Sequence, residues 1–308
     1  MNGPTFDGAP GVPAATVRPT ALARLGATVR VLRFHQWSKN ALVLVAPVLA
    51  HRLDAATLET AALAFLAMGL TASAVYVGND VVDRERDRRH PRKRYRPFAS
   101  GALPIGFGAV LGPALLAAAS LVAWRLPLEL GALLVGYVAV NAVYAVLLKR
   151  VVVLDVLVLA GLYTARIYAG AFATGVPVSE WLATFAMFLF FSLALLKRAS
   201  ELLLVDGDVA GRGYRASDRD PVFALGAASG YISVLVLALY LSSRDVARLY
   251  STPRWLWLLC PLLLYWISRL WILARRGEVH DDPVLHALRD PVSYGVGALA
   301  ALLVGLAT

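Results

Sequence analysis

Charged residues and cysteine are both scarce in this sequence. Only 16% of its 308 residues are Asp, Glu, Lys or Arg, whereas 59% are hydrophobic. A water-soluble domain carries about 25% charged residues, so this deficit excludes an ordinary soluble protein and predicts a polytopic membrane protein. The single cysteine, Cys260, lies in an apolar run and excludes both an intrachain disulfide and a cysteine-based metal cluster.

Acidic residues are scarcer than basic ones. The chain has 20 Asp and Glu against 30 Lys and Arg, which gives a formal net charge of +10. Such an excess follows from membrane orientation alone, because cytoplasmic loops collect Lys and Arg. It also arises in a protein that binds anions at its surface. Both explanations stay open at this point, and we expect no nucleic-acid partner.

The apolar runs predict nine membrane helices in one all-α domain. They lie at 40–54, 57–82, 106–124, 128–148, 152–174, 180–204, 222–242, 254–274 and 291–307. Residues 1–22 contain no apolar run long enough for a signal peptide, and we expect them to form a mobile N-terminal tail. The membrane domain is therefore expected to cover residues 23–308.

Basic residues are distributed unevenly between the two sides of these nine spans. If the N-terminus is cytoplasmic, the inner segments contain the basic clusters at 18–39, 84–96, 149–150, 212–219 and 275–289. The outer segments contain only Arg52, Arg125, Arg244, Arg248 and Arg254. This asymmetry predicts an N-terminus and an active site on the cytoplasmic side of the inner membrane.

The most informative polar segment, residues 78–87, reads GNDVVDRERD and ends the second predicted helix. Asn79, Asp83 and Asp87 are four residues apart, so on a continuing helix they share one face at spacings of about 6 Å. Carboxylates at that distance repel each other by about 3 kcal/mol. Oxygen ligands without His or Cys suit Mg²⁺, which also binds substrate phosphates. The alternative is a solvated helix end whose arginines neutralise these acids; Asp80 is a second-tier metal candidate.

A basic loop follows the acidic face directly. Residues 90–101 read HPRKRYRPFASG and contain Lys93, Arg94 and Arg96. Carboxylates beside such cations suit a diphosphate, because a metal bridges some phosphate oxygens while guanidinium groups bind others. Membrane orientation explains part of this cluster, but it does not explain the adjacent acids.

These motifs resemble a known family. Residues 79–87, followed by KRYRP at 93–97 and Ser100-Gly101, resemble the first Asp-rich motif of the UbiA superfamily of intramembrane prenyltransferases. Residues 33–40, RFHQWSKN, resemble the segment before that family's first helix. The resemblance runs from about residue 30 to the C-terminus. It implies a nine-helix bundle with a cytoplasm-facing cavity in which the motif holds Mg²⁺ and a diphosphate.

The region after the sixth predicted helix departs from the family's aromatic prenyltransferases, which carry a second Asp-rich motif there. Here it reads LKRASEL at 196–202, with RGYR at 212–215. A mainly cationic site fits an anion bound without its own metal, whereas a helix-end ion pair to Glu201 is the alternative. The pattern is similar to the branch typified by decaprenyl-phosphate phosphoribosyltransferase. This likeness implies transfer of phosphoribose from 5-phosphoribosyl diphosphate to a polyprenyl phosphate.

The residue chemistry and the resemblance together define a candidate site. Its catalytic candidates are Asp83, Asp87 and Glu201, and its metal ligands are Asn79, Asp83 and Asp87. Its substrate-binding candidates are Lys39, Lys93, Arg94, Arg96, Arg166, Lys197, Arg198, Tyr214 and Arg215. Arg166, inside the fifth helix, either binds a substrate anion or pairs with an acid such as Asp155. Lys39 either holds the lipid phosphate or anchors the interface beside Trp37.

Three functions remain open from the sequence. The first is the Mg²⁺-dependent phosphoribosyl transfer just described, with 5-phosphoribosyl diphosphate, polyprenyl phosphate and the membrane as partners. The second is transfer of an isoprenyl group from isoprenyl diphosphate to an aromatic or other polar acceptor. The third is a non-enzymatic anion or lipid transporter, which has no need of the acidic helix face. A homo-oligomer is compatible with all three.

Overall fold

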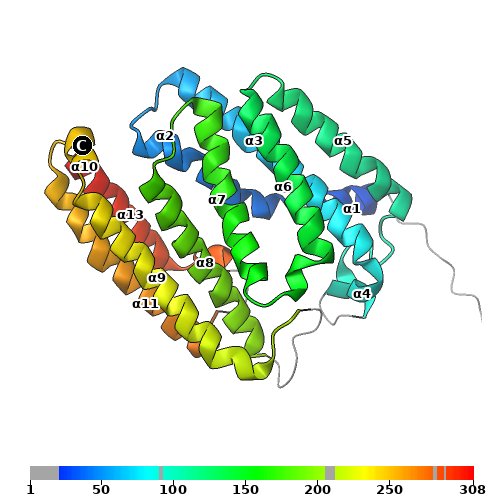
Figure 1. The fold of residues 1–308 in the computed structure, drawn as a ribbon. Helices are drawn as coiled ribbons and strands as arrows, with labels where there is room; N and C mark the ends of the chain where they lie inside the picture. Colours follow the sequence, from blue (N-terminus) through cyan, green and yellow to red (C-terminus); the bar gives the residue numbers. More distant parts are fainter. Residues whose placement is uncertain (1–20, 90–92, 205–211, 280–282, 288) are drawn as a thin grey trace, which may run out of the picture.

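The chain folds into a bundle of helices (Figure 1). A computed structural model describes residues 21–89, 93–204, 212–279, 283–287 and 289–308. Within these ranges the regular structure is entirely helical. Most of the expected N-terminal tail lies outside them.

Seven helical segments are long and apolar enough to cross a membrane in the part of the chain that is described. They are α3 (Ala55–Val82), α5 (Ile105–Ala123), α6 (Leu128–Val146), α7 (Leu154–Thr174), α8 (Glu180–Leu202), α9 (Arg219–Leu241, preceded by η4, Ala216–Asp218) and the unit η5 (Pro253–Leu258) with α11 (Leu259–Arg275). The shorter α13 (Pro291–Ala307) packs against α11. The predicted all-α polytopic bundle is confirmed.

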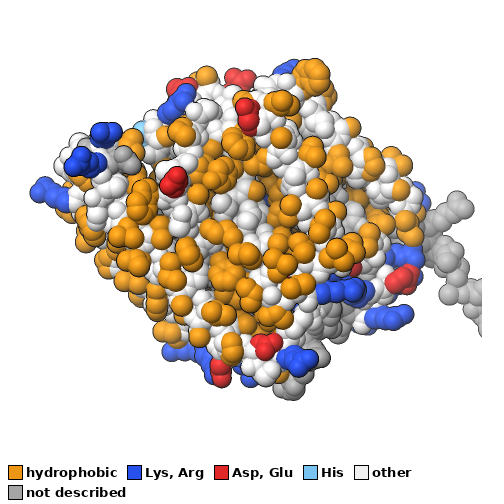
Figure 2. Space-filling view, viewed as in Figure 1, with side chains coloured by type: hydrophobic (Ala, Val, Ile, Leu, Met, Phe, Trp, Pro, Cys, Tyr) orange, Lys and Arg blue, Asp and Glu red, His pale blue; other side chains and the backbone are white. Residues whose placement is uncertain are grey.

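Shorter helices connect the spans. They are α1 (Ala21–Leu32), η1 (Phe34–Leu44), α2 (Val45–Leu49), α4 (Arg84–Arg88), η2 (Lys93–Tyr95), η3 (Leu148–Arg150), α10 (Arg244–Leu249) and α12 (Pro283–Ala287). Figure 2 shows hydrophobic side chains over most of one face, with charged side chains mainly towards its margins. This distribution is that of an integral membrane protein, in which apolar helix surface faces lipid and charge stays in water.

The first predicted span differs most from the structure. The sequence predicts a helix at 40–54, but the chain forms the 3₁₀ helix η1 from Phe34 and ends α2 at Leu49. A 3₁₀ helix has three residues per turn, so residues i and i+3 lie above one another. Arg33, Gln36 and Lys39 therefore fall on one side and all line the same cavity. Asn40 and Val43 are buried on another.

A glycine allows η1 to lie this close to α7. A Cβ atom at Gly170 would lie 1.8 Å from the carbonyl oxygen of Val43, which no real contact permits. We expect Gly170→Ala to lower the free energy of unfolding in detergent by about 1–3 kcal/mol, because the two backbones must separate. Gly161→Ala, in the same helix, is the control, since a Cβ there has nothing within 4 Å. Equal stability of both variants would contradict the close contact.

Candidate active site

A polar cavity of about 280 Å³ lies among η1, α3, α6, α7, α8 and α12. Its charged lining residues are Arg33, Lys39, Arg166 and Lys197. Its neutral polar and aromatic lining residues are Gln36, Asn79, Asn141, Tyr76, Tyr137, Tyr144 and Tyr163. Three predicted anion-binding residues from separate parts of the sequence, Lys39, Arg166 and Lys197, are thus brought to one cavity together with the predicted ligand Asn79.

The predicted metal ligands occupy the junction of α3 and α4. The α-helix ends at Val82, yet the backbone N–H of Asp83 still donates to Asn79 (2.8 Å) and that of Asp87 to Asp83 (2.8 Å). The i, i+4, i+8 register therefore continues through the break. Asp83 is the most accessible of the three aspartates at this junction, with 28% of its side chain exposed against 3% for both Asp80 and Asp87.

Basic side chains from distant segments neutralise the two buried acids. Arg33 pairs with Asp80 at 2.6 Å, and Arg96 bridges Asp80 (3.1 Å) and Asp87 (2.7 Å). Asp83 lies 3.5 Å from both Lys149 and Arg86. The expected arginine pairing occurs, but the strong partners of the buried acids come from other segments. Sequence reasoning missed Arg33, and it considered Asp80 only as a second-tier metal ligand, whereas the structure pairs Asp80 with two arginines.

The donor set at the α3–α4 junction fits Mg²⁺. Asn79, Asp83 and Asp87 offer only oxygen ligands, the kind that Mg²⁺ prefers. Within the described ranges no three His, Cys, Asp or Glu side chains are grouped as a metal cluster. A Mg²⁺ ion at this motif would therefore complete its coordination with water and substrate phosphate oxygens, which is its usual habit.

The basic loop lies between the acidic motif and the end of α8. The Lys93 side chain is largely exposed, yet partial loss of solvation at its amine, then repulsion from Arg96, lowers its pKa below the usual value. Asp87 and Glu201 act on the same amine in the opposite direction. Lys93 thus lies within electrostatic range of both motifs. Arg94 is exposed and stacks on Tyr95, 4.9 Å from its ring centre.

A second ionic cluster joins the ends of α7 and α8. Asp155 and Arg198 are both fully buried and form an ion pair at 2.9 Å, and Arg198 also pairs with Glu201. Arg212 lies 3.5 Å from both Asp155 and Glu201 and donates to the Tyr144 hydroxyl at 3.1 Å. The helix-end ion pair expected as an alternative is therefore present. It extends to Asp155, which sequence reasoning had considered only as a partner for Arg166.

Tyr214 fixes the start of α7 within this cluster. Its hydroxyl donates to Asp155 (2.7 Å) and accepts from the Val153 N–H (2.9 Å), where Val153 adopts a left-handed φ of 66°. Gly213 permits the approach, since a Cβ there would lie 2.4 Å from the Arg150 carbonyl oxygen. Tyr214 is therefore a buried member of this ionic cluster, whereas the Arg215 side chain is exposed.

Arg166 is buried in the middle of α7. Its guanidinium donates to Asn40 Oδ1 (3.1 Å), to the Tyr137 hydroxyl (2.9 Å) and to the Leu162 carbonyl oxygen. None of the described carboxylates pairs with it, and Asp155 is taken by Arg198. The ion pair with Asp155, one of the two roles expected for Arg166, is therefore not present in the described part of the chain. Lys39, above the Tyr163 ring at 5.4 Å, occupies the same cavity.

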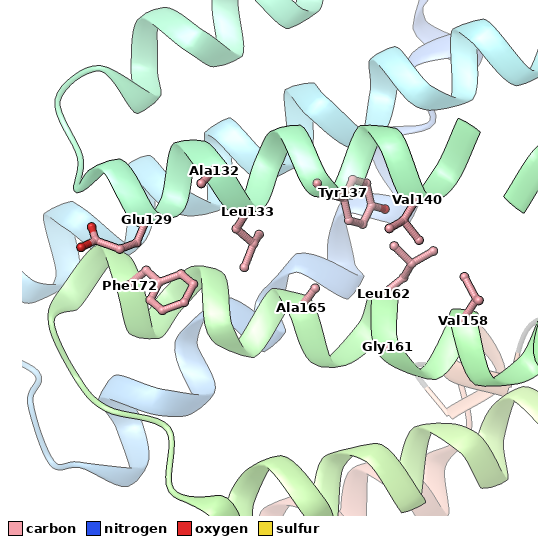
Figure 3. Close-up of a pocket in the computed structure, with 11 residues that line it drawn as sticks. Glu129, Ala132, Leu133, Tyr137, Val140, Val158, Gly161, Leu162, Ala165 and Phe172 are labelled. Atoms are coloured by element: carbon pink, nitrogen blue, oxygen red, sulfur yellow. The ribbon is translucent and has the colours of Figure 1, made fainter. Parts of the chain in front are cut away.

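An apolar groove of about 610 Å³ runs between α6 and α7 (Figure 3). Small residues widen it on both helices, namely Ala132, Gly136, Gly161 and Ala165. Figure 3 shows Glu129 and Phe172 towards one end and Val158 at the other. Tyr137 and Leu162 line both this groove and the polar cavity. Tyr137 and Leu162 therefore lie between the two spaces, and Arg166 bonds both residues. Sequence analysis missed the groove, for which the small residues were the available signal.

Comparison with protein families gives one match, over residues 41–288, to the model described as the UbiA prenyltransferase family. The chain is similar to Nodulation protein NoeC of Azorhizobium caulinodans, at 36% identity over 89% of each chain. It is 36% identical to an uncharacterized protein, y4nM, of Sinorhizobium fredii, over 94% of this chain but only 58% of that relative's length.

Decaprenyl-phosphate phosphoribosyltransferase of Mycobacterium tuberculosis is 38% identical over a shorter region, 58% of this chain and 61% of that enzyme. Among solved structures, a UbiA homolog from Archaeoglobus fulgidus bound to GPP and Mg²⁺ matches 91% of this chain and 97% of its own, with a TM-score of 0.68. At 18% identity this likeness concerns the fold.

Proposed function

The chain belongs to the UbiA prenyltransferase family, and from that premise we propose that it transfers 5-phosphoribose from 5-phosphoribosyl diphosphate to a polyprenyl phosphate. One observation carries this proposal: the protein has two separate cationic regions. One, with Lys93 and Arg96, adjoins the oxygen ligands of the acidic motif. The other, with Arg166, adjoins the apolar groove. The first suits a water-soluble diphosphate and the second an anionic lipid.

Similarity to decaprenyl-phosphate phosphoribosyltransferase supports the same reaction class, since the name of that enzyme describes phosphoribosyl transfer to a decaprenyl phosphate. Membership of a transferase family leaves the transporter interpretation without support. We place the active site on the cytoplasmic side, where the basic loops are expected and where a soluble diphosphate would be available.

In the proposed reaction, an oxygen of the acceptor phosphate forms a bond to C1 of the ribose while the bond from C1 to the pyrophosphate oxygen breaks. The acceptor is already an anion, so no side chain has to remove a proton. Bound at Asn79, Asp83 and Asp87, Mg²⁺ would supply charge neutralisation for the leaving pyrophosphate. Lys93 and Arg96 donate hydrogen bonds to the same pyrophosphate and orient it. The Glu201 carboxylate, shared by Arg198 and Arg212, holds Arg212 towards the donor.

The direct test uses purified protein, labelled 5-phosphoribosyl diphosphate and a series of polyprenyl phosphates, with and without Mg²⁺. We expect label to enter the lipid phase only when Mg²⁺ and a lipid phosphate are both present. The apolar groove would also accommodate an isoprenyl chain, so a parallel reaction contains isoprenyl diphosphate and an aromatic acceptor. Consumption of isoprenyl diphosphate, with no label in the lipid phase, would replace phosphoribosyl transfer by isoprenyl transfer.

The lowered pKa of Lys93 predicts how activity changes on the alkaline side of the pH profile. Its ammonium must be charged to bind the donor, and its lowered pKa means that this charge is lost below the usual lysine value of 10.5. We therefore expect kcat/KM for the donor to fall as pH rises through that lowered pKa. Lys93→Arg, which stays charged, should retain activity at higher pH. Profiles of the two proteins between about pH 7 and pH 10 test this, and coincident alkaline limbs would exclude Lys93 as their origin.

A further inference from the structure

Arg166 lies where the polar cavity and the apolar groove meet. Only two residues line both spaces, Tyr137 and Leu162, and the Arg166 guanidinium donates a hydrogen bond to each of them. A ligand with an anionic head at Arg166 could therefore extend an apolar tail directly into the groove between α6 and α7 (Figure 3). The shared residues therefore bring a charged side chain close to an apolar surface.

Arg166 also has unused binding capacity. A guanidinium carries five N–H donors, and three of its contacts are accounted for by Asn40, Tyr137 and Leu162. The side chain is 4% exposed, and none of the described carboxylates forms an ion pair with it. A buried charge that meets only neutral groups is costly. An anion bound from the cavity would supply the missing opposite charge.

Asn40 supplies an independent observation. Its side chain is 1% exposed, and its Nδ2 has no hydrogen-bond partner in the described part of the chain. The contact of Arg166 Nε with Asn40 Oδ1 fixes which end of the amide faces the guanidinium, and this assignment leaves Nδ2 as an unsatisfied donor. Buried donors without a partner are rare and costly. Asn40 does not itself line the cavity, but it bonds Arg166, which does, so an oxyanion bound at Arg166 is the kind of group that would satisfy Nδ2 as well.

We propose that Arg166, Asn40 and the Tyr137 hydroxyl form a binding site for the phosphate of a lipid phosphate monoester, whose hydrocarbon chain lies in the α6–α7 groove. The identification of this lipid as the acceptor rests on the proposed function. Asn40 is carried by η1, and Gly170 holds η1 against α7, so the close helix contact sets the distance between Asn40 and Arg166. In the proposed function, the donor diphosphate would bind near Asn79, another residue that lines this cavity.

Asn40→Asp tests the site without removing its shape. The new carboxylate would meet Arg166 at the position of Asn40 Oδ1, so the fold is kept, while the Nδ2 donor is lost and the Arg166 charge is neutralised. Binding is measured as thermal stabilisation of the purified protein by farnesyl phosphate, by farnesol and by 5-phosphoribosyl diphosphate with Mg²⁺. We expect Asn40→Asp to weaken farnesyl phosphate binding at least tenfold, to leave farnesol unchanged, and to keep the donor within threefold.

Asn141→Asp is the matched control, because it adds the same charge to the α6 wall of the same cavity. Equal losses in both variants would show a general effect of charge and overturn the site. A variant that loses the donor instead of farnesyl phosphate would overturn it too. Should Asn40→Asp fail to fold, Asn40→Leu removes Nδ2 at similar volume, and we expect a tenfold higher KM for the lipid. An unchanged KM would reject the proposal.

The proposed function and the proposed lipid-phosphate site can be refuted independently of each other. Wild-type protein that binds farnesyl phosphate through Asn40 and Arg166, yet transfers no phosphoribose, would refute the proposed function and keep this lipid-phosphate site. Wild-type protein that transfers phosphoribose, with an acceptor KM insensitive to Asn40→Asp, would refute the site and keep the function.

Discussion

Asp83→Asn is expected to reduce kcat for phosphoribosyl transfer by at least about 100-fold, the scale of losing one group that stabilises transition-state charge. Asp83 is the central residue of the Asn79–Asp83–Asp87 register and the most accessible of its carboxylates. Its amide replacement keeps the shape but removes the negative charge that attracts a divalent cation. The measurement is transfer of label from 5-phosphoribosyl diphosphate into lipid across a Mg²⁺ titration.

Glu85→Gln is the matched control for this experiment. Glu85 lies two residues further on in α4, but its side chain is 63% exposed and pairs with Arg84 and Arg88 on the surface. Surface ion pairs of this kind contribute little, so transfer and its Mg²⁺ dependence should be unchanged. Full activity of Asp83→Asn, or the same loss in both variants, would contradict the role of Asp83.

The spans could be predicted because the membrane imposes a simple rule on sequence. A helix that faces lipid must be apolar over its length and must satisfy its own backbone hydrogen bonds. α5 and α6, the spans with the least burial inside the bundle, follow this rule and were found within a few residues. α13 was also found, although its 17 residues are short for a span.

The segment before α3 could not be predicted in the same way. η1 depends on contacts with residues far along the chain, since Val43 meets Gly170 and the Trp37 ring covers Gly69. The break before it is at Arg33, a non-glycine residue with a left-handed φ of 53°. Hydropathy over 40–54 contains none of this information. No apolar run in the sequence predicts α1, a helix of 12 residues.

The contacts of the candidate site also fall into two groups, those that local spacing could predict and those that it could not. Spacing rules relate residues three or four apart, so Asn79, Asp83 and Asp87 were placed on a common face, and the Arg198–Glu201 pair was expected. Arg33 and Asp80 are 47 positions apart, and Arg198 and Asp155 are 43 apart, too far for any local rule. Such pairings depend on how the helices pack, which only the structure displays.

Asp155→Asn is expected to lower the free energy of unfolding by about 3–5 kcal/mol, the range for breaking a buried ion pair. Asp155 and Arg198 are both fully buried, and Asp155 also accepts from the Tyr214 hydroxyl. The amide keeps the size of the side chain but leaves the Arg198 charge with Glu201 alone, which is 33% exposed. Unfolding in mixed detergent micelles measures the loss. Asp220→Asn is the control, since the Asp220–Arg275 pair is exposed and should contribute nothing measurable.

The double variant Asp155→Asn with Arg198→Met separates a structural role from a functional one. Replacing a buried ion pair by apolar and neutral groups of similar volume is often neutral for stability, so the double variant should recover most of the loss. Arg212 would still keep its Glu201 and Tyr144 contacts. If the Asp155–Arg198 pair acts only by stabilising the contact of α7 with α8, transfer activity should return together with stability. A stable double variant with a raised donor KM would instead show that Asp155 also positions Arg212, its second cationic partner at 3.5 Å, for the donor.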